Sequence, residues 1–168
     1  MPWWKSKKSK NQPPPPEPAN EPEDWENEEE LDEDDRRIMA ILGGKDSPPY
    51  VTTKTLRKYL AYLREHVTLP CRVTGREPFP WEERYTFGPG NRREYQEMKK
   101  TNPCSEDRFD LLGFDDEVDE DEGITASVRR MSDQKEFAIG LDWLEPVDEK
   151  SPEYLLLDDY ATWFVNYR

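Results

Sequence analysis

The chain has 168 residues and a formal net charge of −14, with 33% hydrophobic and 37% charged residues. An acidic surface repels the phosphates of nucleic acids and of anionic lipids, so we expect no nucleic-acid partner and no membrane partner. Such a surface attracts metal cations and basic proteins instead. Composition therefore favours metal cations and basic proteins as partners over nucleic acids and membranes.

Cysteine content and hydropathy bear on the compartment. Cys71 and Cys104 are too few for a disulfide framework, and no spacing of Cys and His indicates zinc. No apolar stretch approaches the roughly 20 residues of a membrane helix. The opening MPWWKSKKSK is basic without a following apolar segment, unlike a signal peptide. We expect a cytoplasmic protein.

Residues 1–47 differ in composition from the rest of the chain. NQPPPPEPANEPEDW is proline-rich and favours polyproline II, and the acidic tract that follows could not enter a core. We expect a disordered tail over 1–47 and one domain over 48–168. RRIMAILGG, near the end of this tail, predicts a short helical turn that docks on the domain.

The first part of the domain predicts a helix and a strand. Leu56, Tyr59, Leu60 and Leu63 recur at helical spacing, which predicts an amphipathic helix over 53–66. Residues 71–75 alternate between apolar and polar side chains, as in a half-buried strand. The polar residues 88–107 indicate a long loop, with about one helical turn near 92–99.

The second part predicts a β-rich region and a final helix. Strands are expected over 108–114, 124–131 and 136–141, with a short closing segment over 142–147. Ser151 and Pro152 then mark the start of a helix of about fifteen residues. The expected fold class is α+β: a small SH3-like or otherwise strongly bent antiparallel sheet, with one helix before it and one after it.

No motif indicates catalysis. The single histidine, His66, ends the predicted helix, where it complements the helix dipole. The sequence contains no phosphate loop, no G-x-G-x-x-G and no G-x-S-x-G. We therefore expect a protein that is not an enzyme.

Residues 115–122, DDEVDEDE, place seven carboxylates between two predicted strands. Closely spaced carboxylates on a flexible loop can supply oxygen ligands to Ca²⁺. Asp115, Asp116, Asp119 and Asp121 are the candidate ligands. The run does not match an EF-hand, because Glu122 stands where that loop requires glycine. An inert solvated loop and a docking surface for a basic protein remain the alternatives.

Three further segments carry a resemblance to a known family. Leu69-Pro70 precedes the alternating strand, LEPVD spans residues 144–148, and DYATWF spans residues 159–164. Together they resemble the small bacterial calcium-binding proteins typified by the cyanobacterial calcium-binding protein, over about residues 55–168. The resemblance implies Ca²⁺ binding through surface carboxylates of a small barrel-like sheet. Asp148 and Asp159 are the acids within the matching segments.

The sequence thus predicts calcium binding of modest affinity, as a buffer or sensor, by a protein that we expect to be a monomer. The six expected ligands are Asp115, Asp116, Asp119, Asp121, Asp148 and Asp159. The alternative is a non-enzymatic interaction module that captures a basic protein partner. In that reading Trp3, Trp4 and Trp25 anchor the partner, because tryptophan is enriched among the residues that dominate binding energy.

Overall fold

The computed structural model describes Pro16 and residues 30–168 of the chain. The compact unit within it is Leu31–Arg168. Trp3, Trp4 and Trp25, the expected partner anchors, lie outside the described residues. None of the described helices combines the length and the hydrophobicity that crossing a membrane requires.

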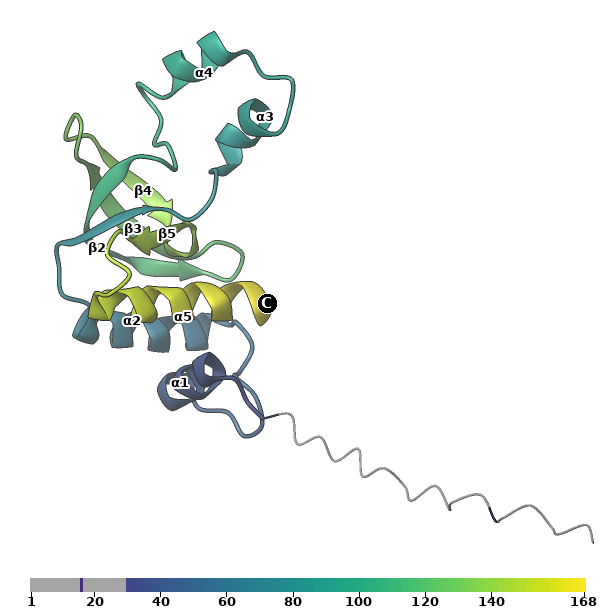
Figure 1. Cartoon of the computed structure of the whole chain (residues 1–168). Coiled ribbons are helices and arrows are strands. Elements are labelled where there is room, and N and C mark those ends of the chain that lie inside the picture. Colours follow the sequence, from purple (N-terminus) through teal and green to yellow (C-terminus); the bar gives the residue numbers. More distant parts are fainter. Residues whose placement is uncertain (1–15, 17–29) are drawn as a thin grey trace, which may run out of the picture. The chain divides into compact units, whose positions relative to one another are not determined.

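The described residues form an α+β fold around one five-stranded antiparallel sheet (Figure 1). The helices are α1 (Glu33–Leu42), α2 (Thr53–His66), α3 (Glu83–Thr86), α4 (Arg92–Met98) and α5 (Pro152–Asn166), with the 3-10 helices η1 (Pro80–Glu82) and η2 (Leu141–Trp143). The strands are β1 (Cys71–Gly75), β2 (Arg108–Asp119), β3 (Gly123–Arg130), β4 (Glu136–Gly140) and β5 (Leu144–Pro146).

The sheet has the strand order β4-β3-β2-β1-β5. β2 is the longest strand, and its first residues pair with β1 while its whole length faces β3. Register shifts interrupt the β2–β3 pairing between Leu111 and Gly113 and between Phe114 and Val118. Such irregularities bend a strand and increase its twist. The predicted antiparallel sheet is therefore confirmed.

Helices α2 and α5 lie side by side along the sheet, and their apolar faces form the core with it (Figure 1). The periodicity of α2 is confirmed, since Leu56, Tyr59, Leu60 and Leu63 are all buried. The Tyr59 ring lies 5.2 Å from the rings of both Tyr160 and Trp163 on α5, measured between centroids. This aromatic group joins the two helices.

Helix α1 corrects two expectations. Two helices precede the sheet rather than one, and the folded unit begins at Leu31 rather than at residue 48. The predicted helical turn is a full helix whose Ile38 and Leu42 enter the core. Apolar residues four positions apart share a helix face, which explains how a short segment beside so much negative charge is held to the domain.

The connection between β1 and β2, residues 76–107, is here called the excursion. It carries η1, α3 and α4 and extends from the sheet on the side away from α2 and α5 (Figure 1). Helix α4 confirms the predicted helical turn near 92–99, whereas α3 and η1 were not predicted. The base of the excursion forms one wall of a hollow of about 540 Å³.

Candidate functional site

The acidic run 115–122 is mostly strand rather than loop. Residues 115–119 end β2, and only residues 120–122 form the turn to β3. The Asp119 carboxylate closes this turn, because its Oδ1 accepts hydrogen bonds from the backbone N–H groups of Asp121 (2.8 Å) and Glu122 (3.0 Å). Asp119 therefore has a structural role in the hairpin.

The turn is fitted closely onto α5. Gly123 has a φ of +74°, and a Cβ there would collide with the Tyr160 hydroxyl and the Phe164 ring. The same hydroxyl accepts a hydrogen bond from the backbone N–H of Ile124 at 2.8 Å. Only glycine satisfies both the left-handed backbone and the close approach. The acidic turn thus has a fixed position beside the end of α5.

The six expected calcium ligands are not gathered at one point. Asp116 accepts a hydrogen bond from Arg64 at 2.6 Å, and Asp148 accepts one from the backbone N–H of Lys150 at 2.9 Å, in a different part of the fold. Asp115 Oδ1 faces the backbone N–H of Glu117 at 3.4 Å. In the described part of the chain, no group of three or more His, Cys, Asp or Glu side chains is placed to hold a metal ion.

Asp159 is buried and paired with an arginine. Its side chain is 5% exposed, and its two oxygens accept hydrogen bonds from Arg37 Nε (2.7 Å) and Arg37 Nη2 (2.8 Å). These hydrogen bonds also raise the pKa of Arg37. The bidentate pair fastens α1 to α5 and uses both oxygens of the carboxylate. Asp159 does not fit the role of a surface calcium ligand.

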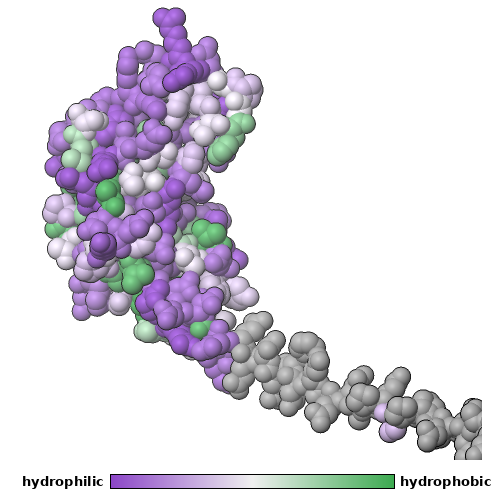
Figure 2. Space-filling model, in the orientation of Figure 1, coloured by the Kyte–Doolittle hydropathy of each residue, from purple (hydrophilic) through white to green (hydrophobic). Residues whose placement is uncertain are grey.

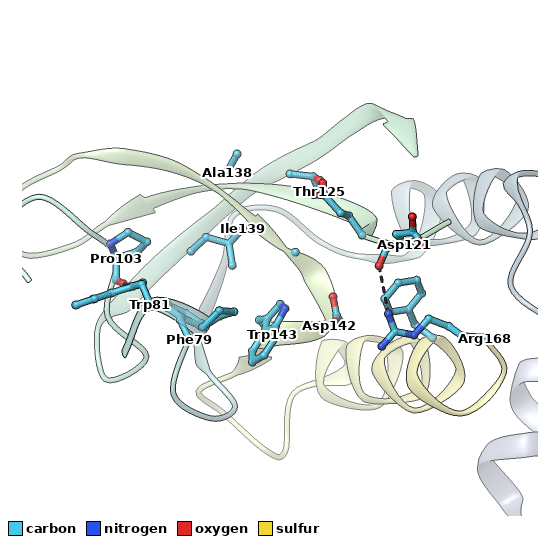
Figure 3. Close-up of a pocket in the computed structure, with 14 residues that line it drawn as sticks. Phe79, Trp81, Pro103, Asp121, Thr125, Ala138, Ile139, Asp142, Trp143 and Arg168 are labelled. Atoms are coloured by element: carbon cyan, nitrogen blue, oxygen red, sulfur yellow. Dashed lines mark hydrogen bonds between the residues drawn. The ribbon is translucent and has the colours of Figure 1, made fainter. Parts of the chain in front are cut away.

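A hollow of about 540 Å³ lies between the base of the excursion, the β2–β3 turn, β4 and the end of α5. The surface in Figure 2 is hollowed below the excursion, and Figure 3 shows the lining residues. Its volume is in the range of ligand pockets. Aromatic, proline and acidic residues line it: Phe79, Pro80, Trp81, Pro103, Asp121, Glu122, Asp142, Trp143 and Phe164, with Arg168.

Asp142, in η2, is the most unusual group of this hollow. Its Oδ1 is buried and has no hydrogen-bond partner among the described residues. Burial raises the pKa of Asp142, while its own backbone N–H and the positive charges of Arg168 and Arg76 act in the opposite direction. A buried carboxylate oxygen without a partner costs free energy. A positively charged group placed beside Asp142 Oδ1 would therefore be stabilising.

Arg168 lies at one end of the hollow. Its Nη1 donates to the backbone oxygen of Asp121 at 3.2 Å, and its guanidinium carbon lies 4.8 Å from the centroid of the Phe164 ring (Figure 3). This distance is typical of cation–π contacts. The chain itself thus shows that this end of the hollow accommodates a cationic group.

Glu82 fixes the aromatic wall. This carboxylate is fully buried and accepts hydrogen bonds from Phe79 N (2.8 Å), Ser105 N (2.9 Å), Tyr95 Oη (2.7 Å) and Cys104 Sγ (2.9 Å). Burial by itself raises the pKa of Glu82, but these hydrogen bonds outweigh it and lower the pKa below its ordinary value. Glu82 therefore joins the first part of the excursion, at Phe79, to its last part, at Cys104 and Ser105.

Most of the residues that line this hollow carry no sequence pattern that predicts a site. Asp142 stands in LDWLEPV, which reads as a short closing strand, and Trp81 stands in PFPWEE, which reads as the end of a strand. Trp81 and Asp142 are 61 positions apart in the chain, so only the fold brings them together. The pairing of acid and tryptophan in Asp142-Trp143 was the one local indication.

Three comparisons, with family models, with curated proteins and with solved structures, gave no match to this chain. The site must therefore be interpreted from its own chemistry.

Proposed function

We propose that this protein is a non-enzymatic binding module whose hollow receives a positively charged side chain of a basic protein partner. The observation that carries the proposal is the buried, unpartnered Oδ1 of Asp142 beside Trp143 in a hollow of about 540 Å³. A lysine or arginine side chain has an apolar stem for the aromatic wall and a cationic end for the carboxylate. A single lysine or arginine side chain can therefore contact both the aromatic and the acidic residues that line the hollow.

Asp142 supplies the energetic basis of the proposed binding. A buried carboxylate oxygen without a partner destabilises the free protein, and a cationic ligand removes that penalty on binding. Residues of this kind are often retained for function at a cost in stability. Asp142 differs in this respect from Glu82 and Asp159, whose oxygens have partners within the fold.

The acidic hairpin supports the same class of partner. Its exposed carboxylates Asp115, Glu117, Asp121 and Glu122 make no ion pair with other described residues. Like charges on an exposed hairpin create a negative potential that increases the rate of encounter with a basic protein. The hairpin therefore steers the partner, and the adjoining hollow holds its side chain.

An SH3-like barrel is part of this proposal. It is supported by the strand order β4-β3-β2-β1-β5, by the 3-10 helix η2 directly before the short last strand, and by the long β1–β2 connection. In this arrangement the excursion and the β2–β3 turn flank the hollow on either side. Both of its sides are then anchored to the sheet, which favours a preformed site. A cytoplasmic location fits the two free, buried thiols.

The test is calorimetric titration of the full-length protein with a short peptide containing lysine and arginine. We expect Asp142→Asn to weaken binding about tenfold, or ~1.4 kcal/mol. Arg168→Gln should strengthen it, because a like charge leaves the hollow. Glu149→Gln, an exposed acid outside the hollow, is the matched control and should change nothing. Equal affinities for the wild type and Asp142→Asn would rule the proposal out.

Calcium binding is the second candidate, favoured by the unpaired carboxylates of the hairpin and by the family resemblance. Without a preassembled group of ligands in the described residues, its affinity should be modest. Thermal melting after chelator treatment, with and without millimolar Ca²⁺, tests it. A ligand at a hundred times its dissociation constant stabilises by about 2.7 kcal/mol. No shift, or an equal shift with Mg²⁺, would leave only the binding module.

A further inference from the structure

Residues 84–100 form the outer part of the excursion and are here called the tip. The tip includes the end of α3, the turn that follows it and all of α4, and it lies at the end of the excursion farther from α2 and α5 (Figure 1). Neither α3 nor α4 contributes a buried residue to the core. Long connections that run over the surface often carry binding residues. The tip is therefore a candidate contact surface.

The tip is ordered by its own contacts. The backbone N–H of Gly90 donates to the backbone oxygen of Arg84 at 2.9 Å, and a Cβ on Gly90 would lie 2.7 Å from that oxygen. Asn91 Oδ1 caps α4 by accepting hydrogen bonds from two of its backbone N–H groups, at 2.8 and 3.5 Å. The rings of Tyr85 and Tyr95 stack with their centroids 5.2 Å apart. A surface that is already ordered loses less conformational entropy on binding.

The tip is basic, although the protein is acidic. Residues 84–100 contain five Lys or Arg and two Asp or Glu, a net charge of +3, whereas the whole chain has a net charge of −14. Arg92 and Arg93 are exposed, and their side chains have no partner among the described residues. Phe87, directly after α3, is 78% exposed. The tip thus presents cationic groups and an aromatic ring, which complement the acidic and aromatic lining of the hollow.

The tip does not occupy the hollow of its own molecule. Trp81 and Pro103, at the base of the excursion, line the hollow, and none of residues 84–100 does (Figure 3). The cationic tip and the acidic hollow are therefore both accessible in one copy. Two copies with a net charge of −14 repel each other, but salt at physiological concentration screens charges beyond about 8 Å. Local charges then decide whether two surfaces attract.

We propose that the basic partner of the hollow is a second copy of this chain, whose tip places Arg92 or Arg93 beside Asp142. Phe87 of that tip contacts the aromatic wall. The inference rests on the proposed function, because it names the partner of the same hollow. The contact is head to tail: it joins two different surfaces, and each pair keeps one free tip and one free hollow. The monomer expected from the sequence is then the species at low concentration.

Sedimentation equilibrium of the full-length protein tests the contact, with dissociation constants between about 1 µM and 1 mM in reach. We expect the wild type to self-associate reversibly and Arg92→Glu/Arg93→Glu to do so about tenfold more weakly. Both positions lie in the first turn of α4, where glutamate favours the helix, so the variant should keep its fold. Lys45→Glu/Arg57→Glu reverses two exposed charges outside the excursion and the hollow. This matched control should leave the affinity unchanged.

A mixture of two variants identifies the two surfaces. Asp142→Asn weakens the hollow and keeps the tip, whereas Arg92→Glu/Arg93→Glu weakens the tip and keeps the hollow. Fluorescence anisotropy with one variant labelled measures their mutual affinity. We expect the mixed pair to bind about tenfold more tightly than either variant binds itself, because one intact tip then meets one intact hollow. A mixed pair that binds no more tightly than the variants bind themselves would overturn the inference.

The remaining outcomes separate this inference from the proposed function. A wild type that stays monomeric, but binds the peptide of lysine and arginine in a manner that depends on Asp142, would overturn the inference and leave the proposed function standing. The same conclusion follows if Asp142→Asn weakens self-association and the arginine reversal does not, because another basic segment then enters the hollow. Absence of both self-association and peptide binding would overturn both proposals.

Discussion

The protein holds two kinds of acid beside its core: Glu82 and Asp159 are buried, whereas Asp142 is only partly buried. Glu82 accepts four hydrogen bonds, and Asp159 accepts two from Arg37. Asp142, by contrast, has a buried oxygen without any partner among the described residues. The first kind holds elements together: Glu82 closes the excursion, and Asp159 fastens α1. The second kind, with its buried Oδ1 unpartnered, is the feature on which the proposed binding site rests.

Replacing Glu82 should have the largest effect. Glu82→Leu leaves four donors without their acceptor, and each unsatisfied buried group costs about 1–3 kcal/mol, so we expect a loss of at least ~3 kcal/mol. Urea denaturation followed by circular dichroism measures it. Glu83→Gln, the exposed neighbour, should change stability by less than about 0.5 kcal/mol. A loss below ~1 kcal/mol for Glu82→Leu would show that the carboxylate does not close the excursion.

The adjacent acids of α5 give the second prediction. Asp159→Asn removes the charged partner of Arg37 and should destabilise by about 1.5–3 kcal/mol, the range for hydrogen bonds to charged groups. Asp158 pairs with Arg76 at 2.7 Å but is 37% exposed, so Asp158→Asn should cost about 0–1 kcal/mol. Chemical denaturation of both variants checks the order. If Asp158→Asn proved the more costly, the assignment of Asp159 as the link to α1 would be wrong.

The smallest expected effect has the opposite sign. Asp142→Asn removes the charge of a partly buried carboxylate whose Oδ1 has no partner among the described residues, and it should stabilise the free protein by about 0.5–1 kcal/mol at neutral pH. Thermal melting of the ligand-free variant tests this. A variant that is less stable and also binds more weakly would show that Asp142 maintains the hollow rather than serving a ligand.

Acidification should separate Glu82 from Asp142. The pKa of Glu82 is lowered in the fold, so its contribution is present above the ordinary glutamate pKa near 4.3 and is lost as the pH falls through the lowered pKa. The pKa of Asp142 is raised, so its penalty is complete above that pKa and vanishes below the ordinary aspartate value near 3.9. The stability gap between Asp142→Asn and the wild type should therefore close as the pH falls.

Local patterns predicted the local elements well. The spacing of Leu56, Tyr59 and Leu60 predicted α2, the alternation at residues 71–75 predicted β1, and Ser151-Pro152 predicted the start of α5. Each of these depends on neighbours within one or two turns. The α+β class and the antiparallel sheet followed from the same patterns.

Long-range partners could not be predicted in the same way. Asp159 and Arg37 are 122 positions apart, and nothing local marks either as half of a buried pair. The acidic run drew attention because its charges are adjacent in sequence, yet Asp119 closes a turn and Asp116 faces Arg64. Asp142 stands among several acids of its segment, and no local pattern distinguishes it from them. Its proposed role depends on the lack of a hydrogen-bond partner for its buried Oδ1 among the described residues.

Arg130 has a consequence for how the excursion tolerates a break in its backbone. Its side chain is 3% exposed and donates to the backbone oxygens of Lys99, Lys100 and Asn102 and to the carboxylates of Asp107 and Asp133. Arg130 and Glu82 thus hold the two ends of the excursion by non-covalent bonds alone. A protease that cut the exposed loop between α3 and α4 would leave two fragments that stay associated and fold as one body.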